Sequence, residues 1–441
     1  MNDTVSTAQP AVHADSTRVG RVRWMIGGLL GFGAFVNYVD RVNLSIAAQP
    51  LAHSLHLSPS QLGIVFSAFL WTYALLQIPI GSIIDRLGVT WVMRIATVLW
   101  TLATFATAMA GGLGLLLVAR LVLGTVEAPM IPAAWKATGY WFPQRERGTC
   151  TAILDGCAKL SNVLGIPVMA YIASRYGWRA VFEATAVLSA VYAVAFWLLY
   201  RDPLQMKSSG RLSEREYAGI VSGGAQPEHQ RGELKVASVG ALLRQRKTWG
   251  LAIGYATYTY SYYVLLTWMP SYLERQLGLN IMSSGIYASV PWIVAVLAEL
   301  AIAGWLVDRL VKRGSNPTSV RRTVLVCSML MSLAVLGAAT TTSLPAVLAY
   351  MSISAAGMAI TAPTASSIVA LIAPDGAVGK LGGIVNCVAN LIGMAAPVVT
   401  GLIVETTGSF AAAFDICGAL VAVGIVCYLF VLGPIEQMRD L

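Results

Sequence analysis

The sequence has little charge and little of the chemistry that enzymes use. Only 12% of its 441 residues are charged, whereas an ordinary soluble chain carries about 25%. The four histidines lie in the N-terminal tail and in expected loops, and the six cysteines form no CxxC pair, so neither a metal site nor a disulfide framework is expected. A phosphate loop ending in Gly-Lys-Ser/Thr is also missing, so ATP is not the expected energy source. We therefore expect no metal, no cofactor and no enzyme activity.

Long apolar runs fill almost the whole chain instead. Apolar residues make up 56% of the sequence, and its mean hydropathy is +0.68. Because a spanning helix needs roughly 20 apolar residues, this content fits about twelve spans with short loops. The runs are too long for barrel strands, so we expect an all-α integral membrane protein. The twelve expected helices are 24–46, 61–83, 91–110, 114–136, 149–173, 179–200, 249–272, 284–307, 323–341, 345–371, 382–404 and 410–433.

Lys and Arg are concentrated in one set of the expected connections. The set that includes the N-terminal tail, the central loop and the C-terminus holds 22 of them, and the opposite set holds three. Positively charged loops stay in the cytoplasm, which predicts a multi-pass protein of the cell (inner or plasma) membrane with both termini inside. The net charge of +9 has the same origin, so no nucleic-acid partner is expected. The expected parts are a tail (1–23), a six-helix half (24–200), a central linker (201–248), a second six-helix half (249–433) and a C-terminal tail (434–441).

A motif recurs at equivalent places in the two halves. The sequence from Gly81 to Gly88, with Asp85-Arg86 inside it, follows the second expected span, and Gly304-Trp-Leu-Val-Asp308-Arg309 follows the eighth. This repeat predicts two pseudo-symmetric halves with a substrate site near the midplane between them. An isolated Asp-Arg pair after a helix would be a weaker signal, because it also marks an ordinary cytoplasmic helix end.

The repeated loop resembles the Gly-x-x-x-Asp-Arg-x-Gly signature of the major facilitator superfamily. Other segments are similar to its anion:cation symporter branch, namely the runs 37–45 in helix 1 and 69–79 in helix 2, Arg120 with Glu127-Ala128-Pro129 in helix 4, and Trp141-Phe142-Pro143 after it. That branch includes proton-coupled carriers of sugar acids and related organic anions, and sialin. The resemblance implies a secondary transporter that imports an organic carboxylate, such as a sugar acid, by proton symport and alternating access. It also implies gating by the loops that carry Asp85, Arg86, Asp308 and Arg309.

The first expected span carries the charged residues Asp40 and Arg41, and the fourth carries Arg120 and Glu127. A charge at the bilayer centre costs roughly 2.5 to 3.5 kcal/mol on insertion scales, so such residues are functional candidates. Arg120 and Glu127 are two turns apart on one face, about 10 Å along the axis, which leaves room for an anion or a water between them. An arginine stays charged and presents a fork to a carboxylate, whereas a buried carboxylate has a pKa that responds to its surroundings. The alternative is a set of static ion pairs.

The resemblance assigns roles to these residues and to several polar ones. Proton coupling is implied for Asp40, Glu127 and Arg41. Contact with the substrate is implied for Arg120, which would bind its carboxylate, and for Tyr38, Tyr73, Asn386 and Asn390. For the tyrosines and asparagines a hydrogen bond between helices is an equally good explanation.

Helix 5 departs from the family pattern, because Asp155 and Lys159 stand at i, i+4 on one face. The two charges either neutralise each other, or Lys159 is a second cationic ligand that suits a dicarboxylate or a bulkier anion. Helix 7 carries a run of tyrosines between Tyr255 and Tyr263, which either line the cavity or belong to an interfacial aromatic belt.

Two other functions fit parts of the pattern. A proton-driven exporter of drugs or organic acids would share the topology and the buried acids, but an exporter of cationic drugs would have little use for Arg120. A transporter-like nutrient sensor would be expected to carry a long signalling tail or a large loop. The expected partners are thus a small organic anion, protons and the lipid bilayer, with the protein acting as a monomer.

Overall fold

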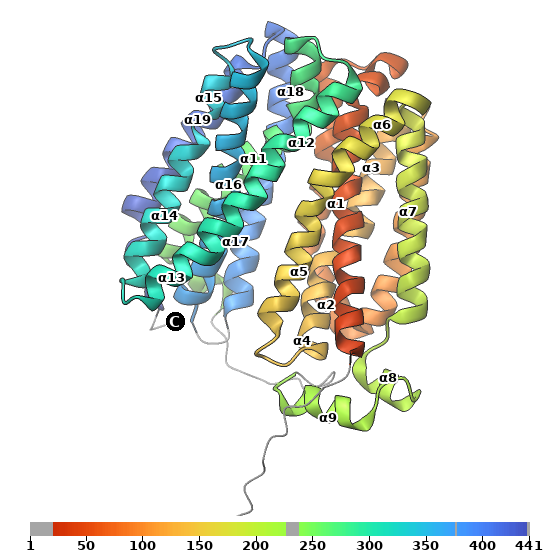
Figure 1. The fold of residues 1–441 in the computed structure, drawn as a ribbon, viewed down its shortest axis with the longest axis vertical. Helices are drawn as coiled ribbons and strands as arrows, with labels where there is room; N and C mark the ends of the chain where they lie inside the picture. Colours follow the sequence, from red (N-terminus) through yellow and green to blue (C-terminus); the bar gives the residue numbers. More distant parts are fainter. Residues whose placement is uncertain (1–20, 226–237, 375–376, 439–441) are drawn as a thin grey trace, which may run out of the picture.

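The computed structural model describes residues 21–225, 238–374 and 377–438, and within these ranges the regular structure is entirely helical. Figure 1 shows two groups of long helices packed side by side, the first in red to yellow and the second in green to blue. Two short linker helices, α8 (Pro203–Ser208) and α9 (Glu214–Ser222), lie below the first group. We call this end of the bundle the linker end and the other the far end.

The first group contains the helices expected for the N-terminal half. They are α1 (Val22–Leu55), α2 (Pro59–Ala108), α3 (Leu113–Glu127), α4 (Met130–Trp141), α5 (Arg147–Leu160), the π-helical turn η1 (Ser161–Gly165), α6 (Ile166–Tyr176) and α7 (Trp178–Leu199).

The second group follows α10 (Val239–Leu243) and contains the helices expected for the C-terminal half. They are α11 (Arg246–Leu277), α12 (Ile281–Ala298), η2 (Glu299–Leu306), α13 (Val307–Lys312), α14 (Pro317–Ser332), α15 (Val335–Ala338), α16 (Leu344–Ile372), α17 (Val378–Gly393), α18 (Ala395–Thr407), α19 (Ala411–Val426) and η3 (Cys427–Val431).

Eleven described stretches are long and apolar enough to cross a membrane. The stretch that falls short is the expected span 249–272, which lies within the 32-residue helix α11. The many tyrosines, threonines and serines of α11 lower its hydropathy. Most of these polar side chains are buried, including Tyr260 and Tyr263 at 4% and 6% exposure, so α11 is shielded by its neighbours.

Helix α2 contains two of the expected spans, which are joined through a kink. It begins at a capping box, in which the Ser58 hydroxyl accepts from the Gln61 amide and the Gln61 side chain accepts from the Ser58 amide. Gly88 interrupts it with φ of +80° and ψ of 159°. This conformation favours glycine, which explains why the loop motif ends on that residue.

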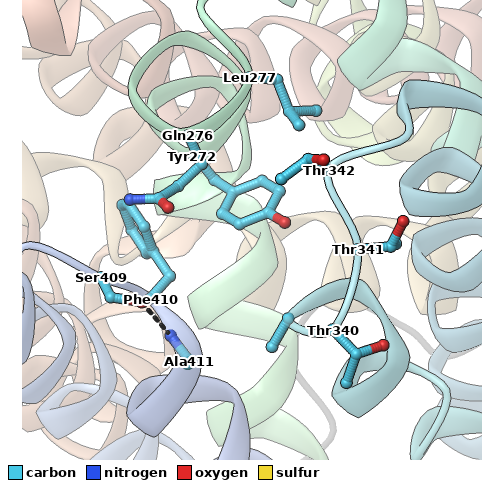
Figure 2. Close-up of a pocket in the computed structure, with 10 residues that line it drawn as sticks. Tyr272, Gln276, Leu277, Thr340, Thr341, Thr342, Ser409, Phe410 and Ala411 are labelled. Carbon is cyan, nitrogen blue, oxygen red and sulfur yellow. Dashed lines mark hydrogen bonds between the residues drawn. The ribbon is translucent and has the colours of Figure 1, made fainter.

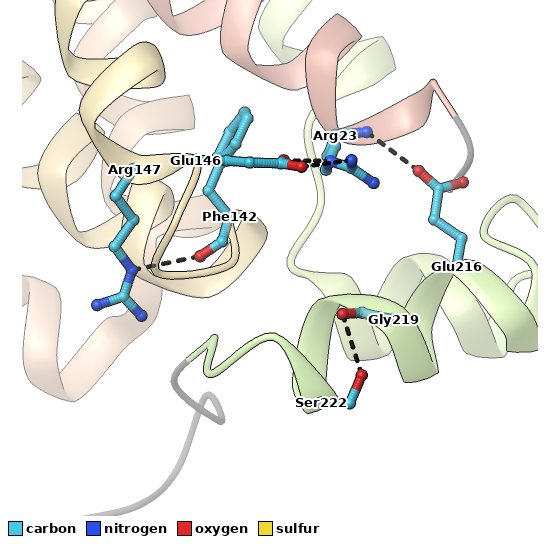
Figure 3. A network of polar contacts seen from close by, with 7 residues as sticks. All are labelled: Arg23, Phe142, Glu146, Arg147, Glu216, Gly219 and Ser222. Atoms are coloured by element: carbon cyan, nitrogen blue, oxygen red, sulfur yellow. Dashed lines mark hydrogen bonds and ion pairs between the residues drawn. The ribbon is translucent and has the colours of Figure 1, made fainter. Parts of the chain in front are cut away.

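The described part of the central linker packs against the N-terminal group rather than hanging free. Figure 3 shows Arg23 of α1 making two hydrogen bonds to Glu146, at 2.7 and 2.8 Å, while its backbone amide faces Glu216 of α9 at 3.4 Å. Arg147 donates to the carbonyl oxygen of Gly224 at 2.8 Å. These bonds fix α9 to the linker end of the first group.

The two groups meet along helices from each half. Near the far end, the Ser45 hydroxyl donates to the carbonyl oxygen of Thr267 at 2.8 Å, and Arg275 donates to the Gln49 side chain at 2.7 Å. Glu405 of α18 accepts from the Ser58 hydroxyl and the Ser60 amide, both at 2.8 Å. Polar contacts therefore tie the start of α2 to the second group.

Candidate functional site

Asp40 is buried in α1 and receives hydrogen bonds from two other helices, α2 and α7, and from its own helix. Its carboxylate accepts from the indole of Trp100, from the hydroxyls of Thr104 and Ser189, and from the Asn43 amide. All of these donors are neutral. The surroundings thus stabilise the charge through hydrogen bonds and leave the carboxylate without an ion-pair partner among the described residues.

Arg120 is buried in α3 on the other side of Asn43. Its guanidinium donates weakly to the Asn43 side-chain oxygen at 3.5 Å and lies over the Phe182 ring, 5.4 Å from the centroid. Because the Asn43 amide also donates to Asp40 at 3.1 Å, this asparagine bridges the two charged groups. The Nε of Arg120 is buried without a hydrogen-bond partner.

Arg41 lies in a cage of aromatic rings between α1 and α2. Its guanidinium carbon is 4.8 Å from the ring centroid of Tyr38, 4.4 Å from that of Tyr73 and 5.3 Å from that of Phe69. The Nε and Nη2 atoms are buried and have no hydrogen-bond partner in the described part of the chain. Rings stabilise a cation through their faces but leave its N–H groups unused, so this guanidinium can still bind an acceptor.

Glu127 is fully buried at a break between two helices. It is the last residue of α3, and Pro129 separates α3 from α4. One carboxylate oxygen accepts from the Asn37 amide at 2.6 Å, and the other has no partner. No described ion pair joins Glu127 to Arg120. The four expected charges are therefore placed in one interior region without pairing to one another directly.

The two asparagines expected in the span 382–404 lie in α17, and one of them contacts a residue of the first half. Asn386 of α17 donates to the Gln77 side chain of α2. Asn390, one turn further, accepts from the Tyr263 hydroxyl at 3.2 Å and donates to the Asn386 carbonyl oxygen at 2.9 Å. Both asparagines thus make hydrogen bonds between helices, Asn386 across the interface of the two halves and Asn390 within the second half.

Lys159 has two carboxylate partners. It pairs with Asp155 one turn earlier, as the i, i+4 spacing predicts, and with Glu299 of η2 in the second half. Sequence reasoning left Glu299 without a role, because no motif marks an isolated acid in a span. Its contact with Lys159 spans 140 residues of sequence.

The loop residues lie away from this interior region. Asp85 pairs with Lys136 of α4 and Arg86 is exposed. Arg309 is exposed and lies over the Trp305 ring at 4.7 Å. The side chain of Asp308 lies outside the part of the structure that is described.

A separate cavity of about 240 Å³ opens at the far end of the second group (Figure 2). It is formed by the end of α11, the loop before α16 and the start of α19, and Figure 2 shows the Tyr272 ring directed at the threonine loop. Its lining residues are Tyr272, Gln276, Leu277, Ala339, Thr340, Thr341, Thr342, Ser409, Phe410 and Ala411. None of them is charged, so this cavity offers no cation for an anionic ligand.

The arrangement of two helix groups around buried charges agrees with the match of the chain to a family model. The model described as Major Facilitator Superfamily matches residues 30–320 and 318–440. The chain belongs to the Major Facilitator Superfamily. It is an all-α membrane transporter of that superfamily and not an enzyme.

Several superfamily members are similar over nearly the whole chain. "Uncharacterized transporter YybO" of Bacillus subtilis (strain 168) is 37% identical, covering 96% of this chain and 97% of that protein. "Probable galactarate/D-glucarate transporter GudP" of the same organism is 31% identical, covering 95% and 93%. The "D-galactonate transporter" of Escherichia coli O6:H1 is 27% identical, covering 97% and 99%. These relatives agree with the resemblance to anion:cation symporters.

A solved structure shows the same superfamily fold. It is the crystal structure of a bacterial homolog of the human lysosomal transporter Spinster, in an inward-facing and occupied conformation. The TM-score is 0.71 at 17% sequence identity, with 94% of this chain and 95% of that chain covered.

Proposed function

We propose that this transporter imports a small organic anion with a carboxylate group, such as a sugar acid, together with protons. The observation that carries the proposal is the Arg41 guanidinium, which is enclosed by Tyr38, Tyr73 and Phe69 and keeps two buried, unpartnered nitrogen atoms. An arginine fork with free N–H groups matches the geometry of a carboxylate. The aromatic rings around it suit the apolar face of a sugar chain.

The remaining expected ligands fit around this centre. Arg120 has an unpartnered Nε, so it too can bind an anionic group. Asn386 contacts the first half through Gln77, and Asn390 lies one turn further along α17, so the amides of both are able to exchange a helix contact for a sugar hydroxyl. The relatives named for galactarate, D-glucarate and D-galactonate support a polyhydroxylated acid as the cargo.

The charge balance of the interior supports coupling to protons. The cations in and beside this region are Arg41, Arg120 and Lys159, and the carboxylates are Asp40, Glu127, Glu299 and Asp155, the last with a side chain that is 57% exposed. With every group ionised, an incoming anion adds to an excess of negative charge. Protonation of a carboxylate removes that excess, so binding of the anion favours uptake of a proton.

Asp40 and Glu127 are the proposed proton carriers. Neither forms an ion pair with another described residue, so each can lose or gain a proton without breaking a salt bridge seen in the structure. Arg41 and Arg120 are the proposed cations whose interactions change when these carboxylates gain or lose a proton. The direction of net transport follows the proton gradient, and the distribution of Lys and Arg predicts that the termini lie in the cytoplasm.

The experiment is uptake of radiolabelled carboxylates by purified protein in proteoliposomes. The panel contains D-galactonate, galactarate and D-glucarate, with a neutral sugar as control. We expect at least one acid to accumulate above its equilibrium level when the outside is more acidic, and to equilibrate without accumulation when the pH is equal. Absence of uptake for every acid would contradict the proposal. Accumulation that does not depend on the pH gradient would show that transport is not coupled to protons.

A further inference from the structure

Lys159, Asp155 and Glu299 form a compact cluster that connects the two halves. Lys159 and Asp155 belong to α5, and Glu299 begins η2 on the opposite half. The Lys159 ammonium contacts both carboxylates. The Glu299 side chain is only 10% exposed and one of its oxygen atoms is buried without a hydrogen-bond partner. One cation is thus shared by two carboxylates, and the cluster carries a net charge of −1 when all three groups are ionised.

Both partners of the cross-half bridge lie next to irregular turns of their helices. Lys159 stands two residues before η1, and Glu299 is the first residue of η2, so each helix widens to a π-helical turn beside the bridge. Such turns are uncommon and recur at functional sites. Ordinary helix packing would not require one on each side of the same ion pair.

The cluster lies close to the proposed anion site. Helix α5, which carries Lys159 and Asp155, packs along α1, which carries Tyr38 and Arg41. The Tyr38 hydroxyl is within electrostatic range of Arg41, Lys159 and Asp155. Tyr258 of α11 is in the same way close to both Tyr38 and Glu299. A second acid group on an anion that binds Arg41 beside Tyr38 would therefore be within the electrostatic influence of the cluster.

We propose that Glu299 determines how many acid groups the cargo carries, because it occupies Lys159 from the opposite half. With Glu299 in place, Lys159 is neutralised and the cluster repels a second acid group, so the transporter selects anions with one acid group. Without the carboxylate of Glu299 the cluster is neutral, and Lys159, which is still paired with Asp155, can donate to a second acid group. This inference rests on the proposed organic-anion transport, and it concerns selectivity within that class.

The test compares two acids with the same carbon skeleton, D-galactonate with one acid group and galactarate with two. Uptake of each is measured at one fixed pH in proteoliposomes, and the ratio of their kcat/KM values is the readout. The variant Glu299→Gln keeps the size of the side chain and removes its charge. We expect the galactarate to galactonate ratio to rise roughly tenfold to a hundredfold, which is the range for a gained charge-assisted hydrogen bond. An unchanged ratio would overturn the inference.

A second variant is expected to change the galactarate to galactonate ratio in the opposite direction, and a double variant is expected to cancel the change. Lys159→Gln leaves two carboxylates without their cation, so the ratio falls below that of the wild type. Glu299→Gln combined with Lys159→Gln removes the freed cation, and the ratio returns toward the wild-type value. If the double variant keeps the full gain of Glu299→Gln, the gain does not come from Lys159 and the inference is wrong. Lys159→Gln alone decides the question should Glu299→Gln fail to fold.

Glu405→Gln is the matched control. Glu405 is another carboxylate that connects the two halves, but its partners are Ser58 and Ser60 rather than a cation. Its removal should leave the ratio unchanged, and a gain like that of Glu299→Gln would contradict a specific role of Lys159. If the wild type carries none of the acids tested, the proposed function fails and the inference falls with it. If the wild type carries galactonate and the ratios do not respond to Glu299, only the inference fails.

Discussion

Asp40 and Glu127 both accept hydrogen bonds from uncharged side chains, but Asp40 accepts more of them. Asp40 accepts hydrogen bonds from Trp100, Thr104, Ser189 and Asn43, whereas Glu127 accepts one from Asn37. Hydrogen bonds to a carboxylate favour its ionised form. The two acids are therefore expected to titrate differently, with Asp40 depending on a shell of residues from α2 and α7.

The variant Trp100→Phe tests the hydrogen bond that the Trp100 indole donates to Asp40. The change keeps a buried aromatic ring and removes the N–H that donates to Asp40. Because the ionised carboxylate loses a donor, we expect Asp40 to bind its proton at higher pH, and the pH profile of uptake to move upward by roughly one unit. The measurement is the initial rate of uptake as a function of external pH.

Trp141→Phe is the control for that prediction. Trp141 is equally buried, but its indole N–H has no hydrogen-bond partner. Its pH profile should match that of the wild type. An equal shift in both variants would mean that the loss of a buried indole, and not the bond to Asp40, moves the profile.

The charged residues could be found from the sequence and their donors could not. Asp40, Arg41, Arg120 and Glu127 stand out because each is a charge inside an apolar run. Trp100 and Ser189 are types that occur widely in spans, and their contacts with Asp40 join residues 60 and 149 positions apart. No local spacing rule reaches that far, so these positioning residues emerge only from the fold.

Helices α2 and α18 approach each other closely at two glycines. A Cβ atom at Gly63 would lie 2.4 Å from the carbonyl oxygen of Pro397, and one at Gly401 would lie 2.4 Å from the carbonyl oxygen of Pro59. Each glycine faces the backbone of the other half, so neither contact can be relieved by a side-chain rotation. The far-end contact between the halves thus depends on both residues lacking a side chain.

Gly63→Ala should disturb this contact. Overpacking against backbone costs about 1 to 3 kcal/mol, which would shift the equilibrium between states with the far end closed and open. We expect the uptake rate to fall by roughly tenfold or more, with size-exclusion profiles and Tm showing folded protein. Gly28→Ala in α1 meets nothing within 4 Å and should leave uptake unchanged. Normal uptake by Gly63→Ala would contradict a role of this close approach in the transport cycle.

Some helix boundaries carry a chemical signal in the sequence, although the span expected at 61–83 starts two residues earlier in the structure. Ser58, Pro59 and Gln61 start α2, and Gly88 interrupts it. The π-helical turns η1 and η2 carry no such signal, since their residues are ordinary apolar and polar types. The tyrosines of α11 were ambiguous between belt and interior, and the structure places Tyr260 and Tyr263 inside because α11 is covered by both groups of helices.

For the molecule as a whole, the repeated loop motif and the superfamily match give the same arrangement of two helix groups. The resemblance on which the prediction of the fold rested is confirmed. The assignment of individual site residues stays a prediction, because they have been placed but their roles have not been measured. What the structure adds is the connection between halves at Lys159 and Glu299, which neither half predicts alone.

The central claim is that Asp40 and Glu127 carry protons that drive import of an organic anion. The most direct measurement pairs two assays on Asp40→Asn and Glu127→Gln in proteoliposomes, namely accumulation driven by a pH gradient and exchange of labelled for unlabelled substrate at equal pH. The account predicts that both variants lose accumulation while exchange persists, because exchange does not require release of the proton. Full pH-driven accumulation in both variants would contradict it, since the protons would then travel through other groups.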